Sequence, residues 1–382
     1  MRISLSAPHA WRVLAPLLVA AGTLAGTASA SALAAGCQAW TGAQPPSPGS
    51  QSNVLNGVAV LSPCNAWAVG FASSGTASQT LIEHWNGAAW TVVPSPSPGS
   101  TGNSLASVRA VSPRNIWAVG QSDSGPAEKT LIVHWNGTAW KQVLSPSPGA
   151  AFSELGGVAA VSARDVWAVG DYSSGTGDKT LIMRWNGTVW KQVPSPSPAS
   201  RSELLAVAAT PDGRAWAVGA TSAAAGDRTL ILRWNGRHWL LVASPDPGAR
   251  NTLTAVAVTS ARNAWAAGFT SRGGPDATLI LHWNGHGWSR TQSPGRGLAS
   301  NDLSAITATS TTNAWAVGVS FANSSAGKAL ILDWNGRSWR LTASPDVPGG
   351  SLLAGVAAAS AGDIWAVGAD DAARQAYAIH CC

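Results

Sequence analysis

The stretch that decides the fold is Asn115-Ile116-Trp117-Ala118-Val119-Gly120, followed by Thr130-Leu131-Ile132-Val133-His134-Trp135-Asn136-Gly137-Thr138-Ala139-Trp140. The Trp-Ala-Val-Gly part recurs in steps of 49 or 50 residues, with tryptophans at Trp67, Trp117, Trp167, Trp216, Trp265, Trp315 and Trp365. The Trp-Asn-Gly part recurs in six copies, and another tryptophan follows each copy, at Trp90, Trp140, Trp190, Trp239, Trp288 and Trp339. A fixed period of this length indicates a repeat architecture.

Each repeat contains four short apolar or alternating runs, named a to d in chain order. In the second copy they are Ser104 to Val111, Ile116 to Gln121, Thr130 to Trp135 and Thr138 to Val143. These runs have the length of strands and show no helical periodicity. Asn136-Gly137 predicts a two-residue hairpin turn between c and d, because both positions accept a positive φ. Each repeat is therefore predicted to be a four-stranded antiparallel meander.

Run a is built from small residues, whereas tryptophan is confined to runs b, c and d. Examples of run a are Gly57-Val58-Ala59-Val60 and Ala206-Val207-Ala208-Ala209. Strands that converge on an axis have little room, while strands that diverge from it need bulk. The gradient therefore favours a radial arrangement over a linear stack of repeats, which needs no such taper.

The two ends of the chain carry complementary parts of one repeat. Trp40 lies 50 residues before Trp90, so the chain begins with an isolated strand d, and residues 351–382 supply strands a, b and c. A repeat divided in this way suits a ring that its last sheet must close. We therefore predict an all-β fold, a seven-bladed β-propeller with four antiparallel strands per blade, whose last blade is closed by the N-terminal strand.

On these repeats the chain resembles the kelch and galactose-oxidase-like group of propellers, whose repeats also have about 50 residues. It is more similar to exported bacterial proteins with Trp-Ala-Val-Gly and Trp-Asn-Gly repeats, over Cys37 to Cys382. One glycine, such as Gly120, follows strand b where kelch repeats have a pair, and the Trp-Asp dipeptide of WD repeats is missing. The resemblance implies the fold and carries no activity with it.

The N-terminus has the pattern of a secretory signal peptide. Arg2 and Arg12 precede a short apolar run, and the small-residue segment Ala28-Ser29-Ala30 follows it. The run is shorter than the about 20 residues of a membrane span. We expect residues 1–36 to be a signal peptide and residues 37–382 to form the propeller, which is then secreted and extracellular.

The four cysteines favour disulfides in an exported chain. Aligning the divided repeat on the second copy places Cys37, Cys381 and Cys382 where the other repeats have their Asn-Gly turn. We expect a disulfide from Cys37 to Cys381 or Cys382, which would contribute about 2–4 kcal/mol, and Cys64 to pair with the remaining cysteine. The alternative is lipidation of Cys37 within a lipoprotein-like segment, residues 33–37, which the disulfide would exclude.

The connections predict one trim face and one loop-rich face. The a–b and c–d turns are short, whereas the b–c and d–a connections, such as residues 121–129 and 145–153, are long. Loops on a rigid scaffold are where binding usually resides. Scattered aromatic and polar side chains on this face suit sugar stacking or peptide binding, and the candidate ligand-binding residues are Phe71, Gln121, Asp123, Asp171, Tyr172, Phe269 and Phe321. The alternative is that each aromatic only packs its own loop.

Metal and cofactor chemistry find little support in the sequence. His84, His134, His282 and His380 share one repeat position, but equivalent positions on different blades are too far apart to bind one zinc ion. We therefore predict a solvent-facing polar position on strand c, with no metal site and no cofactor.

Catalysis needs unlike groups that break the repeat symmetry. Glu154, Glu203, Asp171 and the pair Asp370-Asp371 do so. A glycosidase needs two carboxyl groups about 5–10 Å apart, and the sequence brings no two of these residues together. No catalytic residue is predicted.

The weak net charge excludes a nucleic-acid binder. The formal charge is +6, or +4 without Arg2 and Arg12, and Lys and Arg form no run. The patterns favour a secreted, monomeric, non-catalytic propeller that binds a carbohydrate or an extracellular protein through its long-loop face, without membrane association once the signal is removed. The alternatives are a polysaccharide hydrolase or lyase with its site on the same face, and a structural envelope component.

Overall fold

The computed structural model describes residues 39–382 except 126, 224–225, 298–299, 323–325 and 346, all within the compact unit Ala34–Cys382. The predicted signal peptide, residues 1–36, and Cys37 lie outside the described residues. All regular structure in the described part is β-strand, and no helix long and apolar enough to cross a membrane occurs there. The described chain is therefore all-β, as the sequence predicts.

The strands follow one another in groups of four, and chain neighbours within a group pair antiparallel. The first two groups are β2 Ser52–Ser62, β3 Asn65–Ser73, β4 Ser78–Trp85 and β5 Trp90–Val92, then β6 Gly102–Ser112, β7 Asn115–Asp123, β8 Glu128–Trp135 and β9 Trp140–Gln142. The next two are β10 Ser153–Ser162, β11 Asp165–Ser173, β12 Asp178–Trp185 and β13 Trp190–Gln192, then β14 Arg201–Ala209, β15 Ala215–Ala223, β16 Gly226–Trp234 and β17 Trp239–Leu241.

The remaining strands repeat this order. They are β18 Arg250–Ser260, β19 Asn263–Ser271, β20 Ala277–Trp283 and β21 Trp288–Thr291, then β22 Ser300–Ala308, β23 Ala314–Phe321, β24 Lys328–Trp334 and β25 Trp339–Leu341, and last β26 Ser351–Ser360, β27 Asp363–Asp370 and β28 Gln375–Cys381. β1 Trp40–Gly42 joins the last three. The runs predicted in the second copy correspond to β6–β9, although the observed fourth strand is shorter than predicted.

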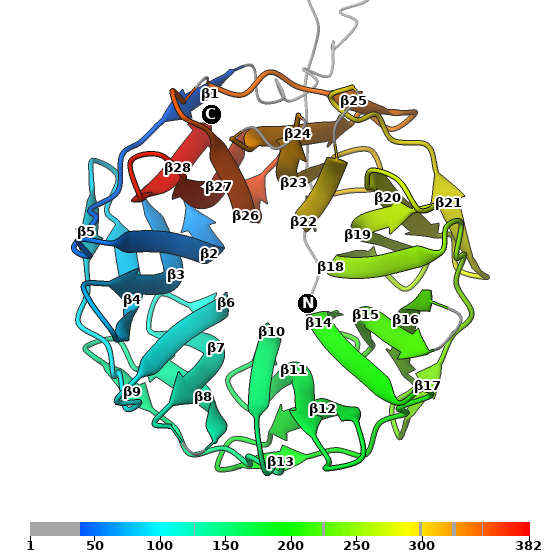
Figure 1. Cartoon of the computed structure of the whole chain (residues 1–382), viewed down its shortest axis with the longest axis horizontal. Coiled ribbons are helices and arrows are strands. Elements are labelled where there is room, and N and C mark those ends of the chain that lie inside the picture. Colours follow the sequence, from blue (N-terminus) through cyan, green and yellow to red (C-terminus); the bar gives the residue numbers. More distant parts are fainter. Residues whose placement is uncertain (1–38, 126, 224–225, 298–299, 323–325, 346) are drawn as a thin grey trace, which may run out of the picture. The chain divides into compact units, whose positions relative to one another are not determined.

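The 28 strands form six hydrogen-bonded sheets, because two groups are joined. Asp178 of β12 pairs in parallel with Arg201 of β14, and the Arg201 Nε lies 2.7 Å from the Asp178 carboxylate. β10–β17 therefore form one eight-stranded sheet. Figure 1 shows the sheets arranged around a central axis, with the first strand of each group, such as β2, β6 and β10, nearest to it.

β1 completes the sheet of β26–β28 from the other end of the chain. It pairs antiparallel with β28, with Trp40 opposite Cys381, and the Ala43 amide donates to the Ala378 carbonyl at 2.9 Å. The order in this sheet is β1-β28-β27-β26, and Figure 1 shows β26 beside β2 of the first group.

Tryptophans pack edge to face between neighbouring groups around the axis. Trp40 of β1 takes this place against Trp315 of β23, with ring centroids 5.6 Å apart and planes at 84°. Trp90 of β5 does the same against Trp365 of β27 at 5.0 Å and 87°. Such pairs contribute about 0.5–1.5 kcal/mol each beyond the area that they bury. Trp40 is thus equivalent to the other outer-strand tryptophans.

A close approach of two strands requires the glycine of the Trp-Ala-Val-Gly motif. β6 is irregular between Leu105 and Ser107, and the Ser104 carbonyl faces Gly120 of β7. A Cβ on Gly120 would lie 2.0 Å from that oxygen, far inside van der Waals contact. The recurring glycine therefore lets the two inner strands pair beside the bulge.

The Asn-Gly turn differs from the prediction of two positive φ values. Gly137 has φ 97°, but Asn136 is not in the positive region. The Asn136 Oδ1 instead accepts hydrogen bonds from the amides of Thr138 and Ala139, both at 3.0 Å. Trp140 opposite Trp135 then closes a four-residue loop. The asparagine side chain fixes this turn, so its backbone does not need the left-handed conformation.

The short turns and the long connections lie at opposite ends of the strands. The end with turns such as residues 112–115 and 135–140 is referred to as the tight-turn side. The end with connections such as residues 173–178 and 192–201 is the loop side. Between them the inner strands enclose a central channel of about 350 Å³.

Candidate functional site

A repeated polar clamp fixes the loop-side connections. In the third group the Thr180 hydroxyl lies 2.7 Å from Ser195 Oγ and 3.0 Å from Ser197 Oγ. The Thr180 amide donates to Ser197 Oγ at 3.1 Å. Thr80 and Thr130 hold the equivalent Ser-Pro-Ser segments in the same way. Each connection is therefore tied to the third strand of its own group.

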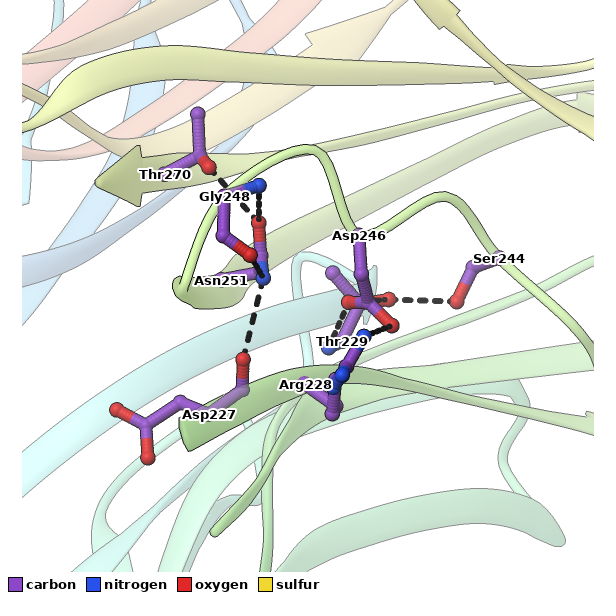
Figure 2. Close-up of polar contacts among 8 residues, drawn as sticks. All are labelled: Asp227, Arg228, Thr229, Ser244, Asp246, Gly248, Asn251 and Thr270. Atoms are coloured by element: carbon purple, nitrogen blue, oxygen red, sulfur yellow. Dashed lines mark hydrogen bonds and ion pairs between the residues drawn. The ribbon is translucent and has the colours of Figure 1, made fainter. Parts of the chain in front are cut away.

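In the fourth group this clamp uses a carboxylate (Figure 2). The amide and the hydroxyl of Thr229 donate to Asp246 Oδ1 at 2.7 and 3.0 Å. Ser244 Oγ lies 2.6 Å from the same hydroxyl, and Arg228 is 3.7 Å from the second Asp246 oxygen. The connection after β17 is thus held by charge as well as by hydrogen bonds.

Asn251, near the start of β18, holds the same connection from its other end (Figure 2). Its Oδ1 accepts from the Gly248 amide at 2.9 Å and from the Thr270 hydroxyl at 2.8 Å. Its Nδ2 donates to the carbonyls of Gly248 at 2.9 Å and Asp227 at 3.1 Å. Because Asn251 is fully buried, these bonds make this part of the loop side a preorganised platform.

Three carboxyl groups gather where β10, β11 and β14 reach the loop side. Glu154 of β10 lies opposite Asp171 of β11, and their side chains interact electrostatically. Glu203 of β14, the neighbouring inner strand, interacts electrostatically with both. Glu154, Asp171 and Glu203 are referred to below as the carboxyl cluster.

Burial and like charge shift the titration of this cluster. Burial is the main cause that raises the pKa of Asp171 to about 8, and the charges of Glu154 and Glu203 raise it further. Burial also raises the pKa of Glu203, against the opposing charge of Arg201. The raised pKa favours the protonated form of Asp171 near neutral pH.

The sequence named all three residues of the carboxyl cluster but brought no two together, and the structure corrects this. The β10–β11 register shifts between Leu155 and Gly157 and again between Ala160 and Ser162. These irregularities place Glu154 opposite Asp171. The exceptional residues were visible in the repeat alignment, whereas their pairing was not.

Four of the predicted ligand-binding residues occupy one equivalent place in the fold. Phe71, Gln121, Asp171 and Phe269 each follow the strand-b glycine and lie opposite an inner-strand residue at the loop side. Burial and the charges of Glu154 and Asp123 raise the pKa of Glu128, and the side chain of Gln121 opposes this shift. The structure therefore places these four residues in one layer, and their binding role stays a prediction.

The other three predicted residues lie further toward the loops. Asp123 accepts a hydrogen bond from the Gly125 amide at 2.8 Å, and Phe321 is 36% exposed. Tyr172 lines a groove of about 710 Å³ together with Lys179, Gln192 and Pro194. Tyr172 thus has a concave surface beside it.

Phe269 already has a partner within the protein. The Arg250 guanidinium lies over its ring at 5.0 Å and forms an ion pair with Asp276 at 2.8 Å. This arrangement matches the alternative that the aromatic packs its own loop.

The recurring histidines were predicted to face solvent. In the structure they are half-buried and link neighbouring strands. His134 Nε2 is 3.0 Å from Asn115 Oδ1, and its ring stacks on Trp117 with centroids 4.1 Å apart. Arg184 replaces the histidine in the third group and pairs with Asp165 through two bonds of 2.7 and 2.9 Å. Burial lowers the pKa of His134. Within the described ranges no group of His, Cys, Asp and Glu could hold a metal ion.

The structure tests one of the two predicted disulfides. Cys64 and Cys382 are exposed free thiols, so the second predicted disulfide is not formed. Cys381 is fully buried beside β1. Because Cys37 lies outside the described residues, its pairing with Cys381 stays a prediction.

Comparisons with known proteins identify the fold. No family model matches the sequence, and neither does any curated protein. A structure of YCF48 bound to a D1 peptide has a TM-score of 0.54 at 16% identity, over 90% of this chain and 97% of that one. A structure of YCF48 from Cyanidioschyzon merolae has a TM-score of 0.56 at 15% sequence identity, and the match covers 90% of this chain and 99% of that one. The GH74 xyloglucanase from Xanthomonas campestris has a TM-score of 0.53 at 13% sequence identity, and the match covers 86% of this chain and 53% of that one.

At such identities this likeness concerns the fold alone. Together with the repeated four-stranded antiparallel groups, it shows a β-propeller. The similar structures do not single out the kelch group that the sequence resembles.

Proposed function

We propose that the chain is a seven-bladed β-propeller, related to the exported Trp-Ala-Val-Gly repeat proteins and closed by its N-terminal strand. The strands fall into groups of four, and among the described residues only the pair Asp178 and Arg201 joins two groups into one sheet. The pairing of β1 with β28 and the packing of Trp40 on Trp315 support closure. A disulfide from Cys37 to Cys381 would reinforce it.

We further propose that this propeller is an exported binding protein whose loop side takes a positively charged segment of a protein or peptide. The carboxyl cluster is the observation that carries this proposal. Three acidic groups crowd together there, at a cost in repulsion and desolvation that a cationic partner would offset. The clamped connections around it provide the rigid frame that binding by loops requires.

A second candidate function, hydrolysis of a polysaccharide at the same place, rests on the raised pKa of Asp171. A carboxyl group that keeps its proton at neutral pH is the general acid that glycosidases need. However, Glu154 lies directly opposite Asp171 on the paired strand, whereas a glycosidic bond must fit between carboxyl groups about 5–10 Å apart. The contact geometry therefore favours binding over hydrolysis.

The test compares the mature wild type with the double variant Glu154→Gln/Glu203→Gln. Lysine-rich peptides of defined length are the probe, and fluorescence anisotropy at low ionic strength is the readout. Asp212→Asn is the matched control, because it removes an exposed carboxylate from a tight-turn-side loop. We expect the double variant to bind at least about tenfold more weakly, since hydrogen bonds to charged groups contribute about 1.5–3 kcal/mol each.

Equal peptide binding by the wild type and the double variant would refute the proposed site. A glycan array combined with reducing-sugar release covers the second candidate. Sugar release by the wild type that Asp171→Asn abolishes would replace binding with hydrolysis as the function.

A further inference from the structure

The central channel holds a charged side chain that no other side chain balances. Among the described residues that line it, Arg109 of β6 is the only charged one. Arg109 lies opposite Trp117. The residues in the equivalent place on the other inner strands are small, namely Ala59, Ala159, Ala208, Ala257, Thr307 and Ala357.

Arg109 forms no hydrogen bond, ion pair or ring contact with any residue that the structure describes. Its side chain is exposed to the channel, and desolvation by the surrounding strands lowers its pKa. A guanidinium still remains charged at physiological pH. A partly desolvated guanidinium without a partner attracts an anion, so an anion at this place would stabilise the protein.

The channel wall adds hydrogen-bond donors to this charge. The inner strands pair antiparallel on their outer edge, and apart from the contact of β14 with β12 their other edge presents both N–H and C=O groups. Ser107 Oγ accepts from the Val158 amide at 3.4 Å, which leaves its own proton available. Thr307 places a second hydroxyl at the level of Arg109. Oriented donors beside a guanidinium are typical of oxyanion sites.

We propose that the central channel binds a small oxyanion, a carboxylate or a phosphate, at the Arg109 guanidinium. The planar guanidinium can donate two parallel hydrogen bonds to two oxygens of such a group. The volume of about 350 Å³ admits a small ligand. This site goes beyond the proposed function, because it lies inside the ring and selects the opposite charge.

The position of Arg109 along β6 indicates the end from which an anion enters. Arg109 lies three residues before Ser112, where β6 ends at the tight-turn side. The carboxyl cluster is at the loop side and repels anions there. Entry from the tight-turn side therefore keeps the anion away from the carboxyl cluster.

The first test is isothermal titration of the mature protein with phosphate and, separately, with acetate at constant ionic strength. Arg109→Ala is the test variant, and five of the other inner strands already carry alanine in this place, so the fold should persist. Arg290→Ala removes the same charge from the exposed outer strand β21 and serves as control. We expect binding at least about tenfold weaker in Arg109→Ala and unchanged in Arg290→Ala.

The two titrations also separate the possible ligands, because tighter binding of acetate points to a carboxylate and tighter binding of phosphate to a phosphate group. The Glu154→Gln/Glu203→Gln variant should still bind the anion. A failure of the channel proposal can therefore be told apart from a failure of the proposed function. Equal affinity of the wild type and Arg109→Ala would overturn the inference.

A second measurement locates the ion directly. Iodide soaked into crystals of the wild type should give an anomalous peak within hydrogen-bonding distance of the Arg109 guanidinium, and Arg109→Ala crystals should lack it. A wild-type channel without iodide, in crystals that bind iodide on their surface, would also overturn the inference.

Discussion

Glu83 is expected to weaken the fold, and its replacement should strengthen it. This residue of β4 is completely buried, and neither carboxyl oxygen has a hydrogen-bond partner. On the same strand, Leu81 belongs to the apolar cluster that joins the first group to β27 and β28, and Trp85 packs against that cluster. Equivalent places in the other groups are apolar and fully buried, namely Val133, Met183, Leu232, Leu281, Leu332 and Ile379.

The magnitude follows from the titration of Glu83. Burial raises its pKa from 4.5 to about 8, so the folded protein holds a proton that the unfolded chain releases between these pH values. The stability that Glu83 contributes is therefore fully present below pH 4.5 and is lost as the pH rises through this window. The loss is about 3 kcal/mol at pH 7 and about 5 kcal/mol above pH 8.

Two variants separate the proton effect from the packing effect. Glu83→Gln removes the titration but leaves a buried polar group, and Glu83→Leu also adds the apolar contact that other groups have. We expect the free energy of unfolding of Glu83→Gln, relative to that of the wild type, to rise by about 3 kcal/mol as the pH goes from 4 to 7. Glu83→Leu should gain about 1.5–3 kcal/mol more at every pH.

The assay is urea denaturation of all three proteins, followed by tryptophan fluorescence, at pH 4, 5.5, 7 and 8. The wild-type free energy of unfolding should approach that of Glu83→Gln at the acid end and fall below it as the pH rises. A difference between these two proteins that stays constant with pH would refute the reasoning, as would a Glu83→Leu variant less stable than the wild type at pH 7.

Three further predictions concern the frame of the propeller. Trp40→Ala and Trp190→Ala should each cost about 3–5 kcal/mol in urea denaturation, because both remove an outer-strand tryptophan from the same packing place. His134 should titrate below pH 6.5 by NMR, and since its folded pKa is lowered, the stability that it contributes should be lost as the pH falls through 6.5. Gly120→Ala should cost about 3 kcal/mol or more in thermal unfolding, whereas Gly42→Ala, where a Cβ meets nothing within 4 Å, should cost little.

The strand order could be predicted because each repeat of about 50 residues contains four strand-length runs of alternating or apolar residues. The runs from Ser104 to Val143 lie within or beside the strands β6–β9. The prediction of a positive φ at Asn136 was wrong. Hydrogen bonds of its side chain fix the turn in place of the backbone geometry that an Asn-Gly pair usually adopts.

The carboxyl cluster could not be assembled from the sequence, because its register depends on two irregularities. Counting back from the pair Ser162 and Asp165 without a shift would place Glu154 opposite Ser173. The observed shifts move the partner to Asp171. Each irregularity shifts the register by one residue, so the partner of Glu154 depends on how many occur, and only coordinates give that number.

Arg109 and Glu83 carried a signal that comparison of the repeats could have found. Arg109 stands where other groups have alanine or threonine, and Glu83 stands where they have apolar residues. The sequence could not show that the walls of the channel enclose Arg109, or that Glu83 lacks a partner. Both facts depend on side chains from neighbouring groups.

Closure of the ring by β1 is tested most directly by amide hydrogen exchange of the mature protein. If the ring is closed, the Ala43 amide, which donates to the Ala378 carbonyl, should exchange as slowly as the amides that pair β27 with β28. Exchange of residues 40–43 at the rate of an unstructured chain, while β26–β28 stay protected, would contradict it.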